Sequence, residues 1–119
     1  MKKLIFLFSV GLFGLLLSCE DTVYGKSVYK YEVTGTATQA KITMNDGNET
    51  TVQHIVDLPW SYAFEKDNMW SFNLFLSAQN QGEDGTTITV RIYRNDKVER
   101  EATSSGAYSI ASVSYSWGE

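Results

Sequence analysis

The chain has few of the residues that usually take part in catalysis or in metal binding, or that stabilise a small domain through disulfide bonds. Its 119 residues include one cysteine (Cys19), one proline (Pro59) and one histidine (His54). A single cysteine excludes an intrachain disulfide, a paired-cysteine redox motif and a cysteine-rich zinc site. The fold must therefore depend on an apolar core, and about 100 residues are enough to form one.

Motifs of the common enzyme classes are also missing. No glycine-rich phosphate loop, HExxH or CxxC sequence occurs. His54 lies in the strand-like segment TTVQHIVD without the partner residues of a catalytic triad, so we interpret it as structural. The acidic turns at Asp46 and at Glu83–Asp84 offer too few oxygens for calcium. We therefore predict no catalytic residue, no metal, no cofactor and no enzymatic activity.

The first eighteen residues have the pattern of an export signal. Lys2 and Lys3 precede an uncharged run of 14 residues, Leu4–Leu17. This run is shorter than the ~20 residues of a membrane-spanning helix and has the length of a signal-peptide core. The alternative, a buried cysteine in an apolar N-terminal helix, fits poorly because the run has no polar face.

Cys19 follows this run directly. The sequence Leu16-Leu17-Ser18-Cys19 resembles a bacterial lipobox, in which the leader is cleaved before the cysteine and the cysteine is acylated with fatty acids such as palmitate. We predict a lipoprotein signal peptide over residues 1–18, and a lipidated Cys19 with a flexible tether over residues 19–27. Two or more acyl chains, at ~0.8 kcal/mol per buried methylene, anchor a protein stably.

This anchor places the chain in the cell envelope, on a bacterial membrane. We expect the outer membrane, and the sequence does not decide whether the domain lies on its periplasmic or its surface face. Glu20-Asp21 resembles a surface-export signal of Bacteroidota lipoproteins, and Thr22 matches the Asp-Thr-apolar pattern of Bacteroidota O-glycosylation.

Without Lys2 and Lys3 the chain has eight basic and fourteen acidic residues, a formal charge of −6, which argues against nucleic acid as a partner.

After the tether, apolar and polar residues alternate with period two, and turn signals recur every 8–12 residues. This pattern predicts one all-β domain over residues 28–119, an immunoglobulin-like β-sandwich of about seven antiparallel strands. The alternation also predicts an exposed edge strand over 97–103, a bulge near Ile110 and an edge or strand-start position for Pro59. The segments with strand-like composition or alternation, from which about seven strands are expected, are 28–35, 40–44, 50–56, 60–64, 69–80, 86–94, 97–103 and 108–117.

The aromatic residues have two interpretations. Rings on alternate positions can line a sugar-binding face, but a sandwich core requires the same spacing. We predict Trp70 and Phe72 in the core, and Trp60 and Trp117 as the tryptophans most exposed. The candidate partner-binding residues are Trp60, Tyr62 and Tyr108, in LPWSYAF and SSGAYS.

Four ordered segments carry a family resemblance: YKYEVTGTATQAKIT (29–43), LPWS (58–61), LSAQNQGEDGTTITVRIYRNDK (76–97) and SSGAY (104–108). They resemble the MmpS family of membrane-associated transport accessory proteins, and equally a group of small Bacteroidota lipoproteins. The resemblance implies a single immunoglobulin-like sandwich outside the cytoplasmic membrane. It also implies, from the actinobacterial branch, assistance to a large RND-type exporter of lipids or siderophores. Family members commonly have a cysteine pair where this chain has about Val90 and Val113, which implies apolar packing there.

Two functional hypotheses follow. The first is a membrane-anchored, non-enzymatic binding or accessory module that assists an envelope transport system. The second is a surface-exposed lipoprotein that binds glycan or a host protein. The sequence leaves open the ligand, the partner and the oligomeric state.

Overall fold

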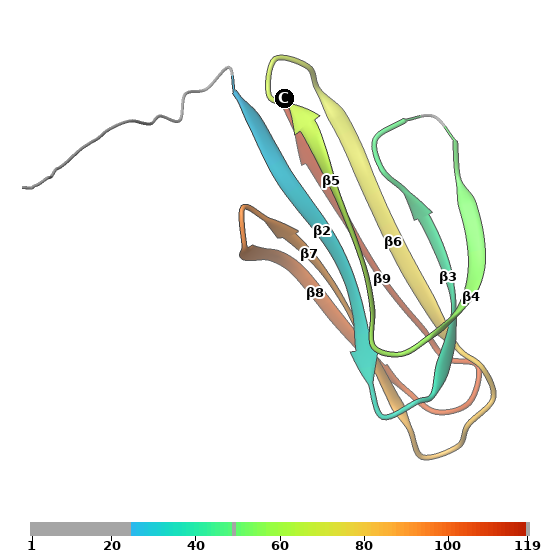
Figure 1. Cartoon of the computed structure of the whole chain (residues 1–119). Helices are drawn as coiled ribbons and strands as arrows, with labels where there is room; N and C mark the ends of the chain where they lie inside the picture. Colours follow the sequence, from blue (N-terminus) through green and yellow to red (C-terminus); the bar gives the residue numbers. More distant parts are fainter. Residues whose placement is uncertain (1–24, 49, 119) are drawn as a thin grey trace, which may run out of the picture.

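In a computed structural model, residues 25–48 and 50–118 are described, and they form eight antiparallel strands in two four-stranded sheets (Figure 1). The predicted all-β sandwich is confirmed, with eight strands rather than about seven. The leader, Cys19, Thr22 and most of the tether lie outside the described residues. The strands are β2 (Lys26–Gly35), β3 (Gln39–Asn45), β4 (Val52–Asp57), β5 (Trp60–Asp67), β6 (Phe72–Asn80), β7 (Thr87–Arg94), β8 (Lys97–Ser105) and β9 (Ile110–Trp117).

The strand order is β5-β2-β7-β8 in one sheet and β4-β3-β6-β9 in the other. Strands β4 and β5 follow each other in the chain, joined by Leu58 and Pro59, yet they belong to different sheets. Each is the edge strand of its sheet. Pro59 immediately precedes the edge strand β5, as predicted, where its missing N–H costs no ladder hydrogen bond. Strand β8 is the predicted edge over residues 97–103.

The core is made by the inward positions of the alternating strands. On β2, Tyr29, Tyr31 and Val33 are completely buried, and Ile88, Val90 and Ile92 are buried on the neighbouring β7. Val90 and Val113 both belong to this core, from opposite sheets, so apolar side chains pack at these two positions. The buried apolar residues are Tyr29, Tyr31, Val33, Ala37, Ala40, Ile42, Met44, Phe72, Leu74, Leu76, Ala78, Ile88, Val90, Ile92, Ala111 and Val113.

The predicted exposures of the three tryptophans are wrong. Trp70 is 66% exposed, because β6 begins only at Phe72 and Trp70 lies in the preceding loop. Trp60 and Trp117 are partly buried against the core. Trp117 donates its Nε1–H to the carbonyl of Asn68 at 3.2 Å, and the guanidinium of Arg94 lies 4.4 Å from its ring centroid.

The bulge expected near Ile110 is also not found there. Strand β9 begins at Ile110 and pairs with β6 in continuous register, with Ile110 outward and 58% exposed. The alternation of apolar and polar residues changes phase in the turn before the strand, where Tyr108 has a positive φ of 60°. The register shift in the described residues lies between Ile92 and Tyr93, where β7 pairs with β8.

The sandwich has two distinct ends, which position everything that follows. At one end, called the proximal end here, lie Gly25, the β5–β6 loop (68–71), the β7–β8 turn (95–96) and Gly118 (Figure 1). At the distal end lie the loops 36–38, 58–59, 81–86 and 106–109. Strand β2 has ten residues, so at ~3.3 Å per residue the two ends are about 30 Å apart.

We expect Trp117→Ala to lower the free energy of unfolding by about 2–4 kcal/mol, because the ring packs on the core and its N–H is bonded. Trp70→Ala should change it by less than about 0.5 kcal/mol, since this ring is mostly exposed. Urea unfolding followed by far-UV circular dichroism measures both. Equal losses in the two variants would contradict the observed burial.

Candidate functional site

One side of the sandwich is closed and the other is open. Strands β8 and β9 contact each other on the closed side, whereas β4 and β5 make no comparable approach among the described residues. The inward side chains of these two edge strands therefore remain accessible. His54 shows this directly, because it pairs with the completely buried Ile42 of β3 and is itself exposed.

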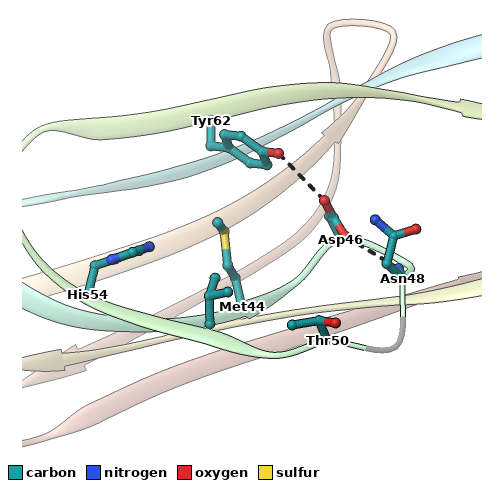
Figure 2. A pocket seen from close by; sticks show the side chains of 7 residues that line it. Met44, Asp46, Asn48, Thr50, His54 and Tyr62 are labelled. Atoms are coloured by element: carbon teal, nitrogen blue, oxygen red, sulfur yellow. Dashed lines mark hydrogen bonds between the residues drawn. The ribbon is translucent and has the colours of Figure 1, made fainter.

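A cleft of about 330 Å³ lies on this open side (Figure 2). We call it the edge cleft. Its lining residues are Met44, Asp46, Asn48, Thr50, Val52, His54 and Tyr62. Met44 and Val52, which face each other across the β3–β4 ladder, give it an apolar lining. Its remaining side chains supply a carboxylate, an amide, two hydroxyls and an imidazole, so it can hold an apolar group and bond polar atoms beside it.

Tyr62 is positioned by a chain of contacts that begins in the core. Its ring stacks on Phe64 with centroids 5.5 Å apart, and Phe64 packs edge-on against buried Tyr31 at 5.1 Å. The Tyr62 hydroxyl makes a long hydrogen bond of 3.5 Å to the Oδ2 of Asp46, which Figure 2 shows as a dashed line. The side chain stays 37% exposed, so it is held in place and still accessible.

Tyr31 also fixes the floor of this region. Its hydroxyl donates to the carbonyl of Asn45, the last residue of β3. Burial raises the pKa of Tyr31 far above its ordinary value, so the hydroxyl keeps its proton and remains a donor. Asp46 follows directly, and its Oδ1 accepts from the backbone N–H of Asn48 at 3.3 Å. The loop that carries the polar lining is thus tied to the core.

The edge cleft is flanked by two free strand edges. Among the described residues, strand β4 pairs only with β3, and β5 pairs only with β2. An edge strand presents unpaired N–H and C=O groups, to which an extended peptide can add as a further strand. Strand β4 is the less protected of the two, because residues 52–56 (VQHIV) contain no charged residue and Ile55 is 58% exposed. Strand β5 has Glu65, Lys66 and Asp67 in its second half.

The structure separates the three predicted partner-binding residues. Tyr62 lines the edge cleft, and Trp60 lies two residues earlier on β5, partly buried at the distal end. Tyr108 is 64% exposed in the distal β8–β9 loop, on the closed side, where its hydroxyl lies over Gly82. Within residues 25–48 and 50–118 no group of three or more His, Cys, Asp or Glu side chains could hold a metal ion.

Sequence reasoning missed most of the edge cleft. Asp46 was considered only as part of an acidic turn, and Met44, Asn48, Thr50 and Val52 were not singled out as site residues. Their shared role depends on β4 and β5 being neighbouring edges, which the strand order decides. The only signal in the sequence is the two-residue Leu58–Pro59 link, too short for either strand to move far from the other.

A profile of the family described as Mycobacterium membrane protein matches residues 18–116. The chain belongs to this MmpS-like family. The match covers most of the chain, including the edge cleft and every distal loop. A search of curated proteins finds no significant match. In the part of this MmpS-like chain that the structure describes, no helix is long and apolar enough to cross a membrane.

Proposed function

We propose that this MmpS-like chain is a non-enzymatic accessory module, anchored to a bacterial membrane through Cys19, that binds a membrane protein of an envelope transport system. The open side of the sandwich supports the docking role most directly. It combines an apolar-lined cleft, an accessible tyrosine and two free strand edges in one place. The family match supports the association with a membrane.

Docking would use β4. A segment of the partner adds to the free edge of this strand, and backbone hydrogen bonds supply most of the affinity. Specificity comes from a partner side chain that enters the edge cleft between Met44, Val52 and Tyr62. Residues 52–56 of β4 carry no charge, and this favours the addition of a partner strand, because charged residues on an edge strand usually prevent it.

Photo-crosslinking in intact cells tests the docking surface. With p-benzoylphenylalanine at position 62, we expect a covalent adduct with a membrane protein. The matched control carries the same group at position 75, since Phe75 is 38% exposed, almost as Tyr62 is, but lies on the outer face of β6. The control should give no adduct above background, and equal adducts from both positions would refute the assignment.

A second variant tests the strand edge itself. Ile55→Lys in the position-62 reporter should reduce the adduct about tenfold, equivalent to ~1.4 kcal/mol of binding free energy, because it places a charge on the docking edge. Val98→Lys on the opposite edge strand β8, where Val98 is 44% exposed, should leave the adduct unchanged. Circular dichroism of both variants confirms that the fold is retained.

A further inference from the structure

Two large apolar side chains stand exposed at the proximal end. Met69 is 60% exposed and Trp70 is 66% exposed, the highest value among the large hydrophobic residues that the structure describes. Scattered exposed apolar residues are common on protein surfaces and carry no meaning alone. This pair is different because of its position beside the start of the folded chain.

The loop that carries the pair is a bonded turn. The backbone N–H of Asn68 donates to the carbonyl of Gly25 at 3.0 Å, and the Ser27 hydroxyl donates to the Oδ1 of Asn68 at 3.1 Å. The N–H of Met69 donates to the Oδ1 of Asp67 at 2.9 Å. These bonds keep the loop against the chain segment that leads to the N-terminal anchor.

The chain length between anchor and fold limits how far this end can lie from the membrane. Gly25 is six residues after Cys19. Six residues span at most about 20 Å when fully extended, which is less than the ~30 Å length of the sandwich. Whether the anchor is a lipid on Cys19 or the apolar leader itself, this tether holds the proximal end within about 20 Å of the bilayer, whereas it sets no such limit on the distal loops.

We propose that the loop Asn68–Ser71 contacts the lipid headgroup interface through Met69 and Trp70. Tryptophan is enriched at membrane interfaces because its ring is apolar and its N–H remains bonded to water or headgroups. The chain after Cys19 has a formal charge of −6, so attraction to anionic lipid does not drive the contact. The contact should therefore form on neutral phosphatidylcholine and persist at high salt. This inference rests on the N-terminal anchoring in the proposed function.

The test uses the full chain, purified from membranes and reconstituted in phosphatidylcholine vesicles that contain brominated lipid. Vesicle flotation first reports whether the chain is anchored. In the floated fraction we expect tryptophan fluorescence to fall by roughly a third relative to unbrominated vesicles, since one of three tryptophans lies in the interface. The loss should be insensitive to salt and should disappear in Trp70→Phe.

The matched control adds Tyr108→Trp to Trp70→Phe. This puts a tryptophan at a position of similar exposure, 64% for the native tyrosine, at the distal end. Its fluorescence should not be quenched. Equal quenching in wild type and Trp70→Phe, or quenching of the distal tryptophan, would overturn the proposal while anchoring stands. If the protein does not float with the vesicles, both the proposed anchoring and the proposed interface contact are wrong.

Discussion

A Gly35→Ala substitution is expected to destabilise the domain by about 3–5 kcal/mol, which is a large part of the ~5–15 kcal/mol typical for a domain. Gly35 ends β2 with a φ of +143°, and it pairs with Ile88 of the central strand β7. A Cβ there would lie 2.1 Å from the carbonyl oxygen of Thr87 and 2.9 Å from the Cα of Ile88. Both are backbone atoms, so no side-chain movement can relieve the overlap.

The same carbonyl also holds the next two residues. The N–H groups of Thr36 and Ala37 donate to the oxygen of Thr87 at 3.0 and 3.3 Å. Displacing it would loosen the β2–β7 pairing and the start of the β2–β3 loop together. Urea unfolding of the purified protein measures the loss.

Gly85→Ala is the matched control for this substitution. Gly85 also has a positive φ of +74°, but an added Cβ would meet nothing within 4 Å. Its expected loss is only about 1 kcal/mol, from backbone strain alone. If Gly35→Ala and Gly85→Ala lower the free energy of unfolding by the same amount, the close approach of β2 and β7 is not the reason for the glycine at position 35.

The second large effect is expected for Cys19→Ser, at a residue outside those that the structure describes. Serine has no thiol to acylate, so the variant should carry no lipid and should largely remain as precursor with residues 1–18 attached. Intact mass and incorporation of labelled fatty acid in the membrane fraction measure both changes. Ser18→Ala, which keeps a small residue before the cleavage point, should mature normally.

A mature Cys19→Ser protein that fractionates with membranes like wild type would show that the lipobox interpretation is wrong. Membrane attachment would then have to come from another part of the chain. The cross-linking result at position 62 does not depend on this outcome, because it reports the docking surface rather than the anchor.

The fold was predictable because alternation is a local property. Tyr29, Tyr31 and Val33 alternate with charged or polar residues, and all three are buried. Alternation does not show where a strand ends. Trp70 has the parity of Phe72, but the Asp67 carboxylate bonds the N–H of Met69 and forms a turn there, so the strand starts later. Trp117 has core parity, and its position near the chain end was wrongly taken to mean exposure.

The candidate site was less predictable because it depends on strand order. Tyr62 was identified as a contact residue from its type and its neighbours. The sequence does not show that β4 and β5 are both edges on one side, or that this side stays open while β8 and β9 close the other. The edge cleft is therefore a tertiary feature, assembled from Met44, Asp46 and Tyr62, which lie on separate segments.

The common location of Gly25 and Gly118 at the proximal end determines how the protein should be labelled (Figure 1). A fluorescent protein or affinity tag fused to the C-terminus would lie beside the loop of Met69 and Trp70 and would interfere with the lipid contact that we propose for these residues. An epitope inserted between Asp84 and Gly85 would instead project from the distal end. Both residues are exposed and an added side-chain atom at Gly85 meets nothing nearby, so the reporter would leave both the proposed anchor at Cys19 and the edge cleft free.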